Sequence, residues 1–235
     1  MLSFAGWSAV VTCLVSFVLC ASLGRQYVER RRTYQLWWSL SFLVAAVASL
    51  LQVVAFADGT WPLLAYRGYV ALSAPVPGLM GAGSVFLLYR RWAPYFAAVI
   101  IAAALLAVWG ATGTLHPVDM HNVLLAGAQV TKTMPSWQVA TGFAVLGALG
   151  AAALVLGAAW SWIRTRQAFN AGIVVGGLVF SVADSLSALN GPAAPYLFFA
   201  AEVVGSVALY LAVRAAGARR TQASEAAAAP APGHA

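Results

Sequence analysis

The chain has 235 residues, of which 62% are hydrophobic and only 8% are charged, and its mean hydropathy is +0.84. A soluble domain typically has about 25% charged residues, so this composition excludes an ordinary soluble domain and indicates a protein embedded in lipid. The net charge of +7 does not indicate a nucleic-acid partner, because eleven of the 13 Lys and Arg residues fall in alternate predicted loops or in the C-terminal tail.

Seven apolar runs are long enough to span a bilayer, which takes about 20 residues. They cover residues 4–23, 36–57, 66–89, 94–112, 137–163, 169–189 and 196–214. The sequence therefore predicts an all-α polytopic membrane protein in which residues 1–220 form a bundle of seven transmembrane helices. Residues 221–235 are rich in Ala and Pro and are predicted to form a disordered cytoplasmic tail.

The arginines predict the orientation of this bundle. Cytoplasmic loops of membrane proteins have an excess of Lys and Arg, and only Arg67 and Lys132 fall in the other set of loops. We therefore expect the N-terminus outside and the C-terminus in the cytoplasm of a protein integral to the cytoplasmic (plasma) membrane.

The predicted third helix, residues 66–89, has Pro75, Pro77 and several glycines in its middle. A proline lacks the backbone N–H and clashes with the carbonyl one turn earlier. In hydrocarbon, the freed carbonyls are tolerated only where protein or a water-filled cavity satisfies them. A helix broken at membrane depth therefore indicates an internal polar site, and we expect unwound backbone from Ser73 to Gly78. The alternative is a structural kink.

Polar residues of four predicted helices lie at one depth, about 9–12 Å below the outer surface at 1.5 Å per helical residue. We expect them to form an outward-facing polar cavity that binds a small molecule or an ion. Its predicted residues are Glu202, Asp184, Gln52, Ser73, Pro75 and Ser206, together with Arg67, which could reach down from the rim. The alternative is that the charged members only join helices by hydrogen bonds, which contribute about 0.6 kcal/mol each in membranes.

The one long outer loop covers residues 113–136 and contains two of the three histidines. Residues 118–130 could form a short interfacial helix with Val123, Leu124 and Leu125 towards the membrane. His116, Asp119 and His121 have side chains that could bind a transition metal, although their spacing matches no zinc signature. A helix capped by Asp119 explains the same residues.

Glycine is frequent in the predicted fifth helix, at Gly142, Gly147, Gly150 and Gly157, and in the sixth, at Gly172, Gly176 and Gly177. Small residues let helix backbones approach closely in membranes. These helices are therefore expected to be a face for a partner membrane protein or for a second copy of the chain. No motif of a known class of enzyme occurs, so we do not expect an enzyme.

Seven helices with an outer N-terminus and a carboxylate on the last helix resemble the microbial rhodopsins. Tyr66 and Arg67 followed by Ser73, Ala74 and Pro75 are similar to the start of that family's third helix, and Leu197 and Phe198 followed by Glu202 and Val203 are similar to its seventh. The resemblance implies a rhodopsin-like bundle. The retinal-binding lysine position is Ser206 here, and the only lysine is Lys132 in the outer loop. Retinal is therefore not expected, and neither is any other cofactor apart from the loop metal.

Three functions follow from these observations. The first is a transporter or sensor that binds its ligand in the outward-facing cavity, in contact with the lipid bilayer. The second is a structural or assembly subunit of a membrane complex, and the third is a metal-dependent membrane enzyme that uses the loop histidines.

Overall fold

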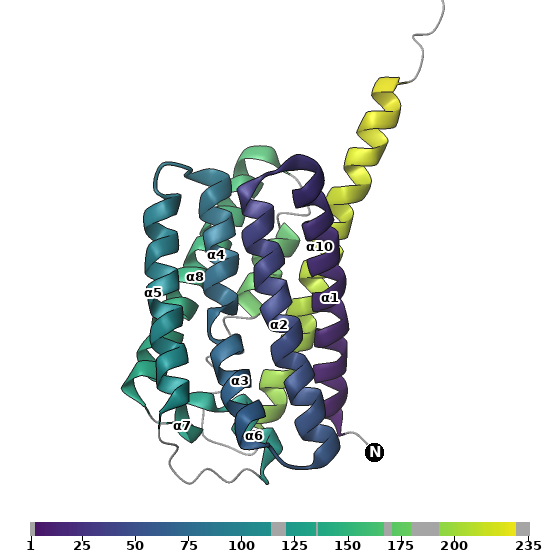
Figure 1. Ribbon diagram of the computed structural model, residues 1–235. Coiled ribbons are helices and arrows are strands. Elements are labelled where there is room, and N and C mark those ends of the chain that lie inside the picture. The colour runs from purple at the N-terminus through teal and green to yellow at the C-terminus, as the bar shows by residue number, and fades with distance from the viewer. Residues whose placement is uncertain (1–2, 114–120, 135, 167–170, 180–192, 229–235) are drawn as a thin grey trace, which may run out of the picture.

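The computed structural model describes residues 3–113, 121–134, 136–166, 171–179 and 193–228 (Figure 1). Helices and short connections account for all of these residues, and no strand occurs among them. The helices are α1 (Phe4–Arg30), α2 (Thr33–Asp58), α3 (Leu63–Ser73), α4 (Pro75–Leu88), α5 (Ala93–Thr112), α6 (Val123–Ala128), α7 (Val130–Thr133), α8 (Trp137–Thr165) and α10 (Ala194–Ala228). Residues 171–179 are also helical.

Six predicted spans are confirmed as apolar helices long enough to cross a membrane. They are Phe4–Arg30, Thr33–Asp58, Leu63–Leu88, Ala93–Thr112, Trp137–Thr165 and Ala194–Ala215. Of the predicted span at 169–189, only residues 171–179 are described, and Asp184 lies outside the described residues. Large apolar side chains such as Leu14, Leu105 and Leu156 remain exposed on the outside of the bundle, as lipid-facing side chains do.

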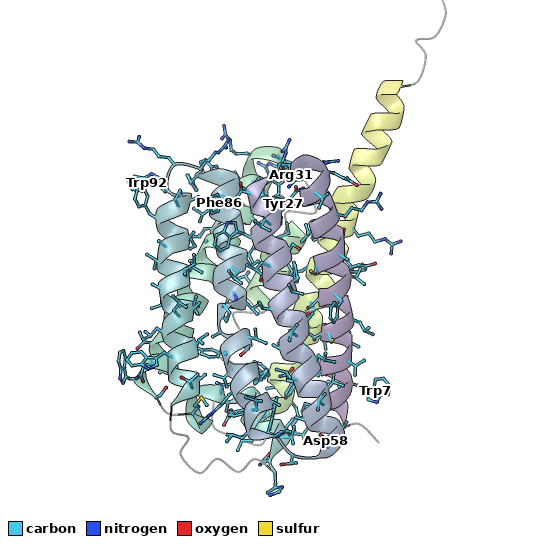
Figure 2. The ribbon with its side chains drawn as sticks, in the orientation of Figure 1. Trp7, Tyr27, Arg31, Asp58, Phe86 and Trp92 are labelled. Atoms are coloured by element: carbon cyan, nitrogen blue, oxygen red, sulfur yellow. The ribbon has the colours of Figure 1, made fainter. Side chains whose placement is uncertain are left out.

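Arginines gather at one end of the bundle, where α1 meets α2 and α4 meets α5. Figure 2 shows Arg31 and Trp92 at this end and Trp7 and Asp58 at the opposite end. We call these the arginine end and the N-terminal end. The side of the membrane that each end faces stays a prediction.

The predicted third span is divided at Ala74 into α3 and α4, as the prolines indicate. Ala74 keeps helical angles, φ −53° and ψ −50°, and Pro75 begins α4 directly. The expectation of unwound backbone from Ser73 to Gly78 is therefore wrong, and the chain is kinked instead. Two α2 side chains stabilise the kinked helix, since Ser41 Oγ donates to the Val76 carbonyl at 2.7 Å and Trp38 Nε1 donates to the Met80 carbonyl at 2.9 Å.

Glycines let α8 pack directly against α4 and α5. A Cβ at Gly81 would lie 2.6 Å from the Gly150 Cα, and a Cβ at Gly142 would lie 2.7 Å from the Ala107 Cβ. Gly157 lies against Leu88 in the same way. The α8 glycines Gly142, Gly150 and Gly157 therefore make contacts within the chain. A partner helix would have to pack against another face of α8.

The last helix continues further than the sequence indicates. α10 runs to Ala228, eight residues past the predicted boundary at 220, and it extends beyond the bundle at the arginine end (Figure 1). Alanine has the highest helix propensity, and the segment from Thr221 to Ala228 is rich in it. Residues 229–235 lie outside the described residues.

Candidate functional site

The segment of residues 121–134, here called the inserted segment, folds into the N-terminal end of the bundle. It contains α6 and α7, and Val123, Ala126 and Val130 are buried in one core cluster with residues of α2 and α3. Val123 faces this core, so the expectation that it faces the membrane is wrong. The Asn122 side chain caps α6 by accepting a hydrogen bond from the Leu125 N–H at 3.1 Å, which is the role proposed for Asp119.

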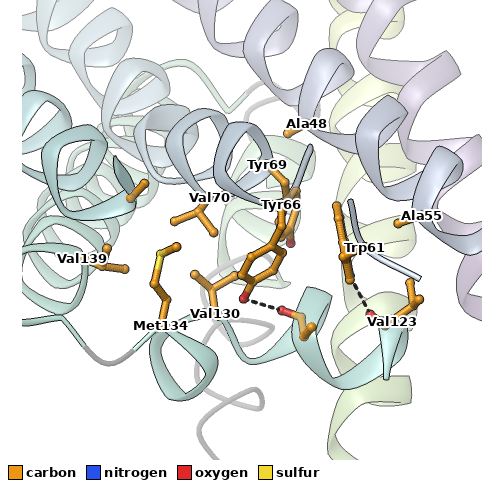
Figure 3. Packing of buried hydrophobic residues seen from close by; sticks show 12 residues of the cluster. Ala48, Ala55, Trp61, Tyr66, Tyr69, Val70, Val123, Val130, Met134 and Val139 are labelled. Carbon is orange, nitrogen blue, oxygen red and sulfur yellow. Dashed lines mark hydrogen bonds between the residues drawn. The ribbon is translucent and has the colours of Figure 1, made fainter. Parts of the chain in front are cut away.

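Three aromatic side chains hold the inserted segment, and we call Trp61, Tyr66 and Tyr69 the aromatic cluster. Trp61 Nε1 donates to the Val123 carbonyl at 3.2 Å, the Tyr66 hydroxyl to Ala126 at 3.2 Å and the Tyr69 hydroxyl to Gly127 at 2.7 Å. Figure 3 shows the first two of these bonds. The last carbonyls of a helix have no partner inside it. Here α3 supplies those partners from one face, because Tyr66 and Tyr69 are three residues apart.

Gln52 of α2 extends this network and is completely buried. Its Nε2 donates to the Tyr69 hydroxyl at 2.9 Å. Its Oε1 is enclosed and accepts no hydrogen bond from the part of the chain that the structure describes. A buried polar atom without a partner costs about 1–3 kcal/mol, and such an atom is a place where a bound molecule, water or ion is expected.

Helix α10 closes the other side of this site. A Cβ at Gly127 would lie 3.5 Å from the Phe199 ring and 3.8 Å from Gln52 Nε2, so α2, α6 and α10 meet at Gly127. Glu202 follows Phe199 by one turn, about 4.5 Å further along the helix axis. Its Oε2 atom is buried, one helical turn beyond the residue that lies against Gly127.

Arg67 is a predicted site residue whose guanidinium group contacts the end of α5. Its Nη2 donates to the Gly113 carbonyl at 3.1 Å, and its side chain lines a groove that also contains Leu51 and Thr112. Arg67 therefore binds the end of α5 and does not contribute charge to the site around Gly127.

The remaining predicted residues lie deeper in the helices. Ser73 Oγ hydrogen-bonds to the Val70 carbonyl of its own helix at 3.4 Å. Pro75 is buried at the start of α4, and Ser206 is buried one turn after Glu202. Gln52 is joined to the aromatic cluster by the hydrogen bond from its Nε2 to the Tyr69 hydroxyl.

Sequence reasoning missed the aromatic cluster and the buried Gln129. Aromatic residues near the end of a span usually indicate an interfacial belt. That interpretation does not suggest that they donate hydrogen bonds to a distant segment of the chain. The spacing of Tyr66 and Tyr69 on one helical face was the available signal.

The metal prediction concerns three residues of which the structure describes one. His121 is exposed just before α6, whereas His116 and Asp119 lie outside the described residues. Within the described ranges, no group of three His, Cys, Asp or Glu side chains is placed to hold a metal. The loop metal site stays a prediction.

Tyr69→Phe is expected to lower the free energy of unfolding by about 2 kcal/mol, because the Gly127 carbonyl and the Gln52 amide both lose a buried partner. Thermal unfolding of the purified protein in detergent measures this effect. Tyr95→Phe is the matched control, since Tyr95 is exposed on α5 and its loss should change stability by less than about 0.5 kcal/mol. Equal stability of the two variants would contradict a structural role for the Tyr69 hydroxyl.

Six apolar spans with exposed apolar outer faces make this chain an integral membrane protein. Comparisons with models of protein families, with curated proteins and with solved structures find no match.

Proposed function

We propose that the protein binds a small cation or a cationic small molecule at the N-terminal end of the bundle, between α2, α3, the inserted segment and α10. The observation that carries the proposal is the enclosed Gln52 Oε1, which accepts no hydrogen bond from the described residues and ends a network of buried, paired groups. An oxygen of this kind attracts a donor or a positive charge.

The chemistry around Gln52 favours a positive ligand. The hydroxyl protons of Tyr66 and Tyr69 are donated to backbone carbonyls of the inserted segment, so neither hydroxyl has a proton left to donate to an anionic ligand. Glu202 adds a carboxylate, and the rings of Trp61 and Phe199 add aromatic surface at the same end. Aromatic faces attract ammonium groups by about 0.5–2 kcal/mol, and carboxylates and amide oxygens are ligands for hard cations.

In this proposal the inserted segment is the gate. It covers the site from the N-terminal end and is held by three side-chain hydrogen bonds from the aromatic cluster. A ligand that binds better when those bonds are released shifts the equilibrium towards an open state. This behaviour is what a transporter or a sensor of an external small molecule needs.

We further infer a seven-helix, retinal-free bundle with a rhodopsin-like arrangement. Support comes from residues 171–179, which pack antiparallel to α10. A Cβ at Gly172 would lie 2.9 Å from the Ala212 Cβ, and a Cβ at Gly176 would lie 2.8 Å from Leu209 Cγ. Residues 171–179 therefore run in the direction that leads from the end of α8 towards the start of α10. The arginine end then faces the cytoplasm.

A second candidate function is that of an assembly subunit, favoured by α10. This helix extends past its candidate membrane span, Ala194–Ala215, as far as Ala228. A helix that leaves the bundle at the arginine end offers a surface to another protein. In a complex, this helix would bind the partner subunit; in a sensor, it would pass the signal to the bound protein.

Choline chloride and sodium chloride are the probes for the ligand site, used at constant ionic strength with the purified protein. A ligand that binds only the folded state stabilises it by about 2.7 kcal/mol at a hundredfold excess over Kd, which we expect to raise the Tm by about 5 °C or more. Glu202→Gln should abolish this shift, because the carboxylate supplies the charge for the cation.

Arg67→Gln is the control, since Arg67 binds the end of α5 and should leave the shift intact. The proposal is wrong if neither probe stabilises the wild type, or if the shift persists in Glu202→Gln. The first of these results would favour the assembly subunit.

A further inference from the structure

The arginine end contains a pocket of about 350 Å³ between the α1–α2 turn and the end of α4. Its polar part is lined by Arg31, Arg32, Thr33 and Arg90, and its apolar part by Phe86 and Leu87. Pockets that bind small ligands start at about 300 Å³. The size fits a polar headgroup.

Among the described residues, no carboxylate pairs with the arginines of this pocket. No carboxylate lies within salt-bridge distance of Arg31, Arg32 or Arg90 in the described ranges of the chain, and Glu29 on α1 pairs with Arg25 at 2.9 Å. Three neighbouring guanidinium groups repel one another, so an anion with several oxygens relieves the repulsion. Guanidinium forks match phosphate geometry in two parallel hydrogen bonds.

The start of α2 adds to this charge. Arg32 is the residue before the helix, and its side chain makes no capping hydrogen bond to the first turn. The first N–H groups of a helix have no partner inside it and carry a partial positive charge. Thr33, the first residue of α2, lines the pocket together with the arginines. The partial positive charge at the start of α2 and the charges of the arginine side chains therefore both favour an anionic ligand.

We propose that this pocket binds the phosphate of an anionic phospholipid whose acyl chains run along the apolar half of the pocket. Leu87 is exposed on the outside of α4, and Phe86 stacks on Trp37 of α2 at 5.7 Å between ring centroids. A soluble phosphate ion has no apolar group that could pack against this apolar half of the pocket. Basic pockets between membrane helices are built in this way for lipid headgroups.

The test measures binding of phosphatidylglycerol and of phosphatidylcholine to the full-length protein in detergent, by native mass spectrometry. We expect wild type to bind phosphatidylglycerol more tightly than phosphatidylcholine. Each arginine near a lipid surface contributes about fivefold in binding, so Arg32→Gln with Arg90→Gln should weaken phosphatidylglycerol binding by about 25-fold. Arg32→Lys with Arg90→Lys should keep most of the affinity, since lysine also binds phosphate as a point charge.

Arg91→Gln with Arg164→Gln is the matched control. It removes the same charge from exposed arginines that do not line the pocket, and it should change binding by less than about threefold. An equal loss in both double variants, or equal affinity for the two lipids, would overturn the proposal. Displacement of the lipid by inorganic phosphate at a similar concentration would overturn it in favour of a soluble phosphate ligand. If the double glutamine variant does not fold, Arg90→Gln alone should weaken binding by about fivefold.

Discussion

Gly150→Ala is expected to lower the free energy of unfolding by about 3 kcal/mol. A Cβ at Gly150 would meet the Pro77 carbonyl and would lie 2.7 Å from the Gly78 backbone nitrogen. Both neighbours are backbone atoms of α4, so no side chain can move aside, and the helices must separate. Overpacking in a dense core costs about 1–3 kcal/mol, and a clash with backbone belongs at the upper end of that range.

Thermal unfolding of the purified protein, compared with Gly68→Ala, checks this expectation. Gly68 is also helical, but its added Cβ would lie 3.3 Å from the flexible end of Leu51. Alanine raises helix propensity by about 1 kcal/mol over glycine, so the control should be as stable as wild type or slightly more stable. A Gly150→Ala protein of wild-type stability would mean that α4 and α8 do not approach this closely.

Trp38→Ala should destabilise the protein by about 3 kcal/mol, at the lower end of the range for tryptophan because Trp38 is half-buried. Its indole fills the space left by Gly83 and packs edge-on against Tyr34, with ring centroids 5.5 Å apart. Its Nε1 also donates to the Met80 carbonyl. Loss of the side chain therefore removes a contact between α2 and α4 and leaves that carbonyl without its α2 donor.

Trp38→Phe separates these two contributions. The phenyl ring keeps part of the packing but donates no hydrogen bond, so a loss of about 1–1.5 kcal/mol is expected. Trp7→Ala is the control, because Trp7 is exposed on α1 and its removal should cost less than about 1 kcal/mol. Equal losses for Trp38→Ala and Trp7→Ala would contradict the role of Trp38 between α2 and α4.

Both substitutions act on the helix that follows the proline kink, and the kink positions α3. The aromatic cluster lies at or next to α3 and holds the inserted segment. A loosened α4 should therefore weaken cation binding together with stability, whereas Glu202→Gln should weaken binding with a smaller effect on stability. Comparing the three variants separates the scaffold from the proposed site.

Hydropathy and charge along the chain determined the class of protein, six of the spans and the clustering of arginines at one end. These properties follow from the sequence because lipid requires long apolar runs whatever they pack against. The prolines also predicted the division of the third span. They did not predict that Ala74 keeps helical angles or that Ser41 and Trp38 of α2 donate hydrogen bonds to the carbonyls of Val76 and Met80.

Tertiary structure alone decided which polar residues meet. The sequence-based cavity had Gln52 at the shared depth and Arg67 reaching down to it from the rim, but depth says nothing about the direction in which a side chain leaves its helix. Arg67 binds Gly113, 46 residues further along the chain, whereas Tyr69 binds Gly127, 58 residues away. The inserted segment is likewise held by donors about 60 residues distant. Pairings at such separations depend on helix rotation and packing, which no local pattern of residues specifies.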